Sequence, residues 1–191
     1  MTIRGSREDR LAAIAKLQRG RVSRDQLLAA GITKTMIQTM LRTGSLRRRR
    51  RGVFAVGHEA PAELATETEA LLACPPGTIL GHHSSAGAIW TLLPPDPHAV
   101  DVIVPGDSSP RLPGIRAHRT STLDPKKDVR IRHGLPVTSP ARTFVDIAGD
   151  TPEPQLDRAL DDALARNLLR LTQLRDALDP RRPNSQRRPP P

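Results

Sequence analysis

The first third of the chain carries apolar residues at the spacing of short helices. Apolar positions that recur at intervals of three and four predict a helix over about residues 7–18. Ser23 is suited to cap a second helix that ends at Gly31, and Thr33 a third that ends at Gly44. A short helix, a tight glycine turn and another helix predict a helix-turn-helix unit.

The third predicted helix has two different faces. One face is apolar: Met36, Ile37, Met40 and Leu41. The opposite face places hydroxyls, an amide and a guanidinium at positions i, i+3, i+4 and i+7: Thr35, Gln38, Thr39 and Arg42. These side chains can hydrogen-bond to base edges and phosphates, and no acid among them repels phosphate. A purely structural surface helix would more often carry Glu and Lys pairs there, so this face favours a recognition helix.

A predicted hairpin follows this helix directly. Strands over residues 46–50 and 53–56 flank a turn at Arg51 and Gly52. The first strand and the turn carry five consecutive arginines, Arg47 to Arg51. We expect them to lie along the wing of a winged helix, where they reach backbone phosphate or the minor groove.

The remaining sequence predicts an α/β arrangement. Helices are expected over residues 62–73, from Ser84 or Ser85 through Leu93, from Pro140, over 153–167 and from Thr172 through Leu178. Strands are expected over residues 100–104, 115–119, 129–132 and 135–138. Leucines spaced by four (Leu156, Leu160, Leu164 and Leu168) predict packing against the chain's own sheet, and a dimer or partner surface is the alternative.

These elements predict an α+β fold in three parts. Residues 1–57 are expected to form a winged helix-turn-helix domain, and residues 58–179 a small α/β domain. Residues 180–191 contain proline, arginine and polar residues, and we expect them to be disordered.

Charge separates the first part from the rest. The chain has a net charge of +10, yet residues 1–57 alone hold 14 Lys and Arg against 3 acids. The remainder, with 16 basic and 17 acidic residues, is close to neutral. A chain that was merely rich in arginine would spread it evenly, so the asymmetry favours a nucleic-acid-binding module joined to a neutral partner domain.

Amino-acid composition excludes several further classes of protein. The single cysteine, Cys74, excludes an intramolecular disulfide and a cysteine-rich zinc module, and we expect it to be a small buried residue. With two Phe, one Trp and no Tyr, the chain has few stacking groups for single strands, so duplex DNA fits better. No apolar run is long enough to span a bilayer, and we expect a cytoplasmic protein with no membrane partner.

The sequence contains no recognisable catalytic or metal-binding motif. His82 and His83 are adjacent, cannot point the same way on one element, and have no acid or cysteine at ligand spacing; we expect them to cap or pack beside a helix. His118 and His133 lie among arginines, where a surface role is expected. There is no Glu-x-Lys, phosphate loop or nucleophile elbow. We therefore expect no enzyme activity, no metal and no cofactor.

Three segments in order carry a resemblance to a known family. They are RRGVFAVGH (Arg50 to His58), GHHSSAGAIWTL (Gly81 to Leu92) and GLPVTSPARTFVDIA (Gly134 to Ala148). With the N-terminal pattern they resemble the AbiEi-like antitoxins and transcriptional regulators of abortive-infection toxin–antitoxin systems, over roughly residues 7–178. The resemblance implies an N-terminal winged helix that binds repeats in its own promoter and represses the operon. It also implies a C-terminal domain that opposes a nucleotidyltransferase-like toxin without necessarily forming a stable complex.

The resemblance places DNA contacts on the polar face of the third helix and on the wing. The full set that we expect to bind DNA is Ser23, Arg24, Thr33, Lys34, Thr35, Gln38, Thr39, Arg42, Arg47, Arg48, Arg49, Arg50 and Arg51. Two alternatives stay open: a protein-interaction module with only nonspecific nucleic-acid affinity, and a nuclease fusion that has lost its catalytic domain. Monomer and homodimer are both compatible with the sequence.

Overall fold

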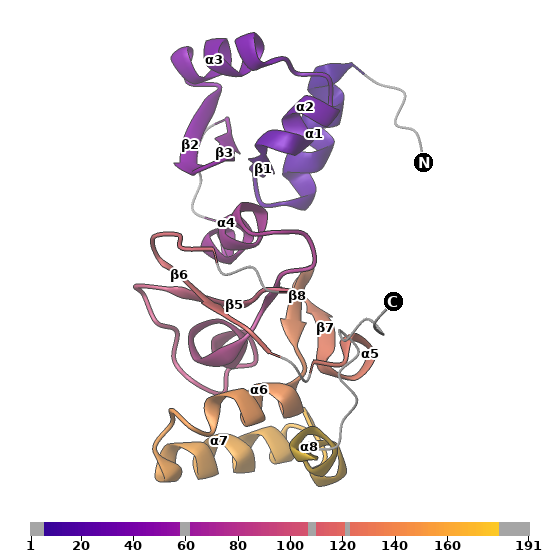
Figure 1. Ribbon diagram of the computed structural model, residues 1–191, viewed down its shortest axis with the longest axis vertical. Helices are drawn as coiled ribbons and strands as arrows, with labels where there is room; N and C mark the ends of the chain where they lie inside the picture. The colour runs from indigo at the N-terminus through magenta and orange to yellow at the C-terminus, as the bar shows by residue number, and fades with distance from the viewer. Residues whose placement is uncertain (1–5, 58–61, 107–109, 121–122, 180–191) are drawn as a thin grey trace. The chain divides into compact units, whose positions relative to one another are not determined.

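The computed structural model describes residues 6–57, 62–106, 110–120 and 123–179 (Figure 1). The expected disorder of residues 180–191 concerns a segment outside the described residues. The chain divides into two compact units, Met1–Cys74 and Pro75–Pro191. Helices and strands occur in both units, as the predicted α+β class requires.

Three short helices open the first unit. They are α1 (Arg7–Leu17), α2 (Arg24–Ala29) and α3 (Lys34–Arg42). The predicted caps are present: Ser23 Oγ accepts a hydrogen bond from the backbone N–H of Gln26, and Thr33 Oγ1 accepts one from that of Met36. Because a cap satisfies N–H groups that have no partner within the helix, these side chains set where α2 and α3 begin.

A three-stranded antiparallel sheet completes the core of this unit. Its strands are β1 (Arg21–Ser23), β2 (Leu46–Arg50) and β3 (Val53–Val56), in the order β1-β3-β2. The predicted β2–β3 hairpin is confirmed, whereas β1 was not predicted, because three residues are too few to show an alternating pattern. The sheet and the three helices share one apolar cluster: Leu11, Ala15, Val22, Leu27, Ile32, Ile37, Leu46 and Phe54.

Helix α4 (Ala65–Ala73) belongs to the first unit and packs against β1, β2 and β3. This differs from the expected domain boundary after Gly57, which placed residues 62–73 in the second domain. Ala70 is fully buried and Glu69 is 4% exposed. Glu69 therefore lies inside the first unit, beside its arginines.

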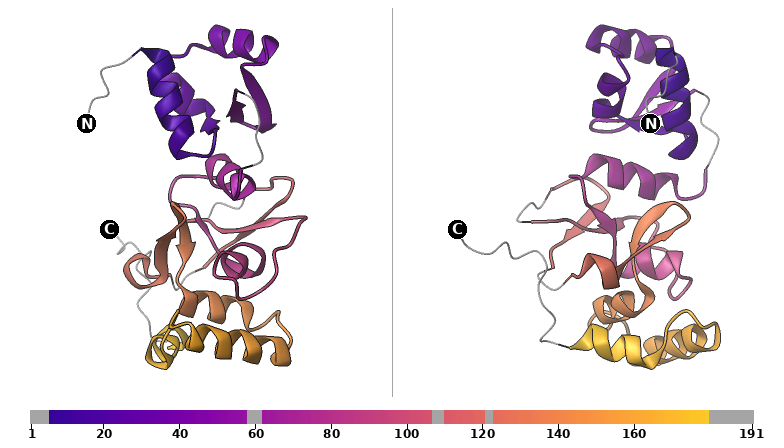
Figure 2. Two further views of the ribbon diagram at one scale, coloured as in Figure 1. Left: turned by 180° about the vertical axis from the view of Figure 1, so that it is seen from behind. Right: turned by 90° about the vertical axis from the view of Figure 1, so that its right-hand side faces the viewer.

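The second unit is built on a five-stranded mixed sheet (Figures 1 and 2). Its strands are β4 (Ile79–Leu80), β5 (Val100–Ile103), β6 (Ile115–His118), β7 (Val129–Arg132) and β8 (Leu135–Thr138), in the order β6-β5-β4-β8-β7. β5 and β6 are parallel, as are β4 and β8, and the other pairs are antiparallel. Four strands match the prediction; the central β4 has only two residues and was missed.

Several helical segments accompany this sheet. They are the π-helical turn η1 (His82–Gly87), α5 (Pro125–Asp128), α6 (Pro140–Ile147), α7 (Glu153–Ala165) and α8 (Leu171–Leu178). α6 packs against η1 and α8 and lies between the sheet and α7 in Figures 1 and 2. α5 was not predicted, and α8 begins one residue before the expected cap at Thr172. Among the described helices, none is long and apolar enough to cross a membrane.

The segment predicted as a serine-capped helix begins earlier than expected. η1 starts at His82, whose φ is 54°. The preceding Gly81 packs so closely on β5 that a Cβ at this position would lie 2.6 Å from Ile103 Cγ1. This approach brings the start of η1 against the centre of the sheet. The leucines spaced by four on and after α7 are half-buried, and its buried positions are Ala159 and Ala163.

Candidate functional site

The polar face of α3 is exposed along its length. Thr35, Gln38, Thr39 and Arg42 are all exposed, whereas Ile37 on the other face is 4% exposed and belongs to the core. The apolar side chains of the helix thus hold it to the unit, which leaves its hydroxyl, amide and guanidinium groups open to a ligand.

The five arginines after α3 form two groups. Arg47, Arg48 and Arg51 are exposed and form no ion pair among the described contacts, whereas Arg49, also exposed, and Arg50 pair with an acid. Arg48 lies opposite Phe54 in the hairpin, and its guanidinium carbon is 5.7 Å from the centroid of that ring. This cation–π contact orients Arg48 on the sheet without consuming its charge.

Arg49 and Arg50 are instead directed at the carboxylate of Glu69 on α4. Arg49 Nε donates to Glu69 Oε1 at 2.8 Å, and Arg50 Nε lies 3.8 Å from Oε2. Arg21 on β1 donates from Nε to the same Oε1 at 2.8 Å, with both side chains 5% exposed. One buried carboxylate therefore neutralises part of a cluster of three arginines.

A β-bulge explains how two consecutive arginines reach one acid. Side chains of successive residues in a regular strand point to opposite faces. Here the register shifts between Arg48, which pairs with Phe54, and Arg50, which pairs with Val53, so Arg49 is an extra residue in β2. A bulge re-aims the side chains beside it, and this one lets both Arg49 and Arg50 approach Glu69.

The four remaining predicted DNA-binding residues lie where α2 and α3 begin. Ser23 and Thr33 act as caps through their oxygens, so each hydroxyl hydrogen can still donate. Arg24 and Lys34, the first residues of α2 and α3, are exposed. The Arg24 N–H donates to Gly52 O at 2.7 Å, which ties the start of α2 to the turn of the hairpin.

The second unit contains a polar pocket that no motif in the sequence indicates. Asp101 on β5 is 2% exposed; its Oδ1 lies 2.7 Å from His118 Nε2 and accepts from Arg116 Nε at 2.8 Å. His118 was expected at the surface, but it is partly buried and its ring stacks on that of His82 with centroids 3.7 Å apart. Burial and the neighbouring His118 lower the pKa of His82 to about 4.

Asp146 on α6 lines the same pocket. Its side chain is 4% exposed, and Oδ1 accepts from Arg142 Nε at 2.8 Å one helical turn away. Oδ2 is buried without a hydrogen-bond partner among the described residues. Burial raises the pKa of this carboxyl to about 6 against the opposing charge of Arg142. No spacing rule could have identified these residues, because the sheet order brings β5, β6, η1 and α6 together.

The pocket has a volume of about 550 Å³, within the range of small-molecule sites. The lining includes Pro94, Pro95, Asp96, Pro97 and Asp150 besides the residues above. Arg116 lies between two acids, since its Nη2 is 2.8 Å from Asp96 Oδ2 and 3.0 Å from Asp101 Oδ2. The hydrogen bond to Asp101 raises the pKa of Arg116.

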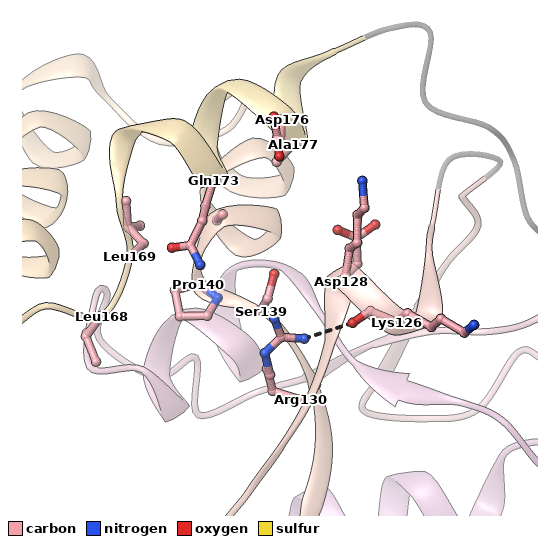
Figure 3. A pocket seen from close by; sticks show the side chains of 12 residues that line it. Lys126, Asp128, Arg130, Ser139, Pro140, Leu168, Leu169, Gln173, Asp176 and Ala177 are labelled. Atoms are coloured by element: carbon pink, nitrogen blue, oxygen red, sulfur yellow. Dashed lines mark hydrogen bonds between the residues drawn. The ribbon is translucent and has the colours of Figure 1, made fainter.

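A smaller hollow of about 280 Å³ lies between α5, the start of α6 and α8 (Figure 3). Its lining includes Lys126, Lys127 and Arg130. Arg130, however, donates from Nη1 to the carbonyls of Val129 and Lys126, at 2.8 and 3.3 Å. Asp128 beneath it is 1% exposed and accepts from the backbone N–H of Asp124 at 2.8 Å. Arg130 therefore hydrogen-bonds to nearby backbone carbonyls. The pocket lined by Asp101 and Asp146, which holds buried carboxylates, is the better candidate for a binding site.

Within the described ranges, no group of three or more His, Cys, Asp or Glu could hold a metal ion. Cys74 is only half-buried, and its burial raises the pKa of the thiol. The expectation of a buried Cys74 is therefore met only in part, because this residue lies just past the end of α4.

Comparison with solved structures describes the class of fold. A crystal structure of the RV2827C protein from Mycobacterium tuberculosis matches with a TM-score of 0.53 and 20% sequence identity, over 94% of this chain and 73% of that chain. At this identity the likeness concerns the α+β fold alone. No curated protein matches the chain.

The family is shown by a match to the model described as the AbiEi antitoxin C-terminal domain, over residues 80–187. Because this span is more than half of the chain, the protein belongs to the AbiEi antitoxin family. The resemblance read from the three sequence segments is thereby confirmed. Membership supports a role as the antitoxin of a toxin–antitoxin system.

Proposed function

We propose that the first unit is a winged helix-turn-helix that binds duplex DNA and represses the chain's own toxin–antitoxin operon. One observation carries the proposal: α3 exposes a polar face free of acids, and β2, which packs against α3, exposes arginines next to it. A helix of this kind fits a major groove, and arginines beside it bind phosphate.

Within this site the residues have different tasks. Gln38 and Arg42 read base edges, because an amide and a guanidinium can each form paired hydrogen bonds with a base. Thr35, Thr39, Ser23, Thr33, Arg24 and Lys34 contact the phosphates on either side. Arg47, Arg48 and Arg51 bind backbone phosphate along the wing, which positions the protein but carries no direct base readout.

DNA affinity should be measured on the chain's own upstream DNA and on scrambled DNA of equal length. Replacing Gln38 or Arg42 with Ala should weaken the specific complex by about 1–3 kcal/mol for each lost base contact and leave scrambled DNA little changed. Lys16→Ala, on α1, is the matched control because it removes an exposed charge outside the site. Equal affinity for the two DNAs before and after these changes would refute sequence-specific binding.

We further propose that the second unit counteracts a nucleotidyltransferase-like toxin and that the protein acts as a monomer or homodimer in the cytoplasm. Membership of an antitoxin family supports the antitoxin part of this proposal. The two activities can be separated in the full chain by combining Gln38→Ala with Arg42→Ala. This variant should lose repression and still rescue growth when the toxin encoded by the neighbouring gene is expressed. Loss of rescue together with loss of DNA binding would contradict the division of labour.

A further inference from the structure

We propose that the pocket between β5, β6, η1 and α6 of the second unit binds a guanidinium group, carried by an arginine side chain or by a small alkylguanidine. The proposal concerns this unit alone and does not depend on DNA binding.

The pocket offers acceptors and little free positive charge. Its lining contains four aspartates (Asp96, Asp101, Asp146 and Asp150). Of the described lining residues, Arg116 is the only arginine or lysine, and it is bonded to Asp96 and Asp101. His82 is neutral near pH 7, since its pKa is about 4. An anion would therefore meet a net negative surface, whereas a cation is attracted to it.

A buried acceptor gives the pocket a specific point of attachment. Oδ2 of Asp146 is buried and has no hydrogen-bond partner among the described residues. The whole side chain is only 4% exposed. Leaving a buried polar atom unpaired is costly, so such an atom in a folded protein calls for a partner. A donor supplied by a ligand would satisfy it once the side chains that cover Oδ2 in the ligand-free pocket move aside.

A guanidinium meets these requirements better than an ammonium. It carries five N–H donors in a planar fork that matches carboxylates, and it is weakly hydrated, so it loses less on entering a half-buried pocket. Asp150 at the rim is exposed and can accept a second hydrogen bond. The volume of about 550 Å³ accommodates the group and its alkyl stem.

The walls of the pocket are held in place before any ligand arrives. His82 has a left-handed backbone (φ 54°) at the start of a π-helical turn, and both features are frequent at functional sites. Its ring is stacked on His118, which is bonded to Asp101. Asp101 in turn accepts from Arg116, and its N–H donates to Ser85 Oγ at 2.9 Å. A pre-organised pocket loses little conformational entropy on binding.

The test uses the full chain and calorimetric titration with three probes. Nα-acetyl-arginine amide represents an arginine side chain of a protein, agmatine a free alkylguanidine, and tetramethylammonium a cation without N–H donors. We expect saturable binding of at least one guanidinium probe and none of tetramethylammonium. Tighter binding of the arginine amide identifies a protein side chain as the source; tighter binding of agmatine identifies a small molecule. Failure of both guanidinium probes to bind, or equal binding of tetramethylammonium, overturns the proposal.

Variants locate the site. Asp146→Asn keeps an oxygen for Arg142 but replaces the free acceptor, and affinity should fall at least about tenfold, the loss expected for a charge-assisted hydrogen bond. Asp161→Asn, an exposed acid on α7 outside the pocket, should bind as the wild type does. The imidazole NMR signals of His82 and His118 should shift with each bound probe. Unchanged affinity of Asp146→Asn overturns the proposal.

If Asp146→Asn does not fold by circular dichroism, Asp150→Asn replaces it. Its side chain is exposed, so the fold should be retained, and affinity should fall severalfold. Wild-type affinity of this variant, or probe-induced shifts absent from His82 and His118, overturns the assignment. Because every readout is a binding measurement on the second unit's pocket, its failure is distinguishable from a failure of DNA repression.

Discussion

Arg49 on β2 donates from Nε to Glu69 Oε1 on α4 at 2.8 Å, although the two residues are 20 positions apart in the chain. Because of this ion pair, the five consecutive arginines do not all have the same role. Arg21 binds the same oxygen and Arg50 approaches the other. Arg49 and Arg50 thus serve the packing of α4 on the sheet, and the exposed Arg47, Arg48 and Arg51 are the better candidates for phosphate contacts.

Glu69→Gln should destabilise the first unit by about 3 kcal/mol, because removing one partner of a buried ion pair leaves charge uncompensated. Arg21, 4% exposed, would lose its charged acceptor. Urea unfolding followed by circular dichroism measures the change. Glu67 on the same helix forms no ion pair among the described contacts. The unfolding free energy of Glu67→Gln should therefore stay within about 0.5 kcal/mol of the wild type. Similar stability of both variants would contradict the structural role of Glu69.

Arg47→Ser and Arg49→Ser should separate phosphate binding from folding. Arg47 is exposed, so its loss should reduce the dependence of log K on log salt by about 0.9 for the lost contact, with stability unchanged. Arg49→Ser should lower the melting temperature instead and leave the salt dependence nearly intact. Binding measured at several salt concentrations, together with thermal melts, distinguishes them. Equal salt slopes for the two variants would place both residues in the same role.

Asp146 should make stability depend on pH in an unusual direction. Its pKa is raised from 3.8 to about 6 in the folded protein, so between these values the folded state holds a proton that the unfolded chain has released. The stabilisation is therefore present below pH 3.8 and is lost as the pH rises through 6. Relative to Asp146→Asn, the wild type should lose roughly 2 kcal/mol of unfolding free energy from pH 4 to 7. His82 titrates in the opposite sense, so the comparison with the variant is needed.

The carboxyl itself can be followed by ¹³C NMR, with an expected midpoint near 6. A midpoint close to the ordinary value of an aspartate would show that Asp146 is more solvated than its 4% exposure indicates.

Gly81→Ala should destabilise the second unit by about 1–3 kcal/mol, the usual cost of overpacking a core. A Cβ at this position would lie 2.6 Å from Ile103 Cγ1 and 2.7 Å from Cδ1. Gly149→Ala is the matched control, since a Cβ there meets nothing within 4 Å. Chemical denaturation measures both. Adding Ile103→Ala to Gly81→Ala should cost less than the two separate changes together, because the clash disappears; strict additivity would argue against direct contact.

Local patterns predicted most elements of the chain. α1, α2 and α3, the β2–β3 hairpin and α6 follow from apolar spacing, caps and glycine turns, all of which act over a few residues. The two missed strands, β1 and β4, have three and two residues, too short for any periodicity to show. Residues of this kind become strands only because a longer neighbour supplies the hydrogen bonds.

Of the two candidate sites, one could be predicted from local sequence pattern and the other could not. The polar face of α3 could be predicted because helical geometry alone places Thr35, Gln38, Thr39 and Arg42 on one side. The pocket could not, since Asp101, His118 and Asp146 come from three elements that the sheet order β6-β5-β4-β8-β7 and the packing of α6 bring together. His118 was expected at the surface because its sequence neighbours are arginines, which say nothing about what lies across the sheet.

The sequence by itself determined the charge asymmetry, the two faces of α3, the arginine run and the resemblance to the AbiEi antitoxins. These properties depend on composition and on contacts between near neighbours in the chain. Only the tertiary structure decided which arginines pair with an acid, because a β-bulge and the distant Glu69 engage Arg49 and Arg50. It also decided that Asp146 holds a buried oxygen without a partner, since burial arises when segments far apart in the sequence pack together.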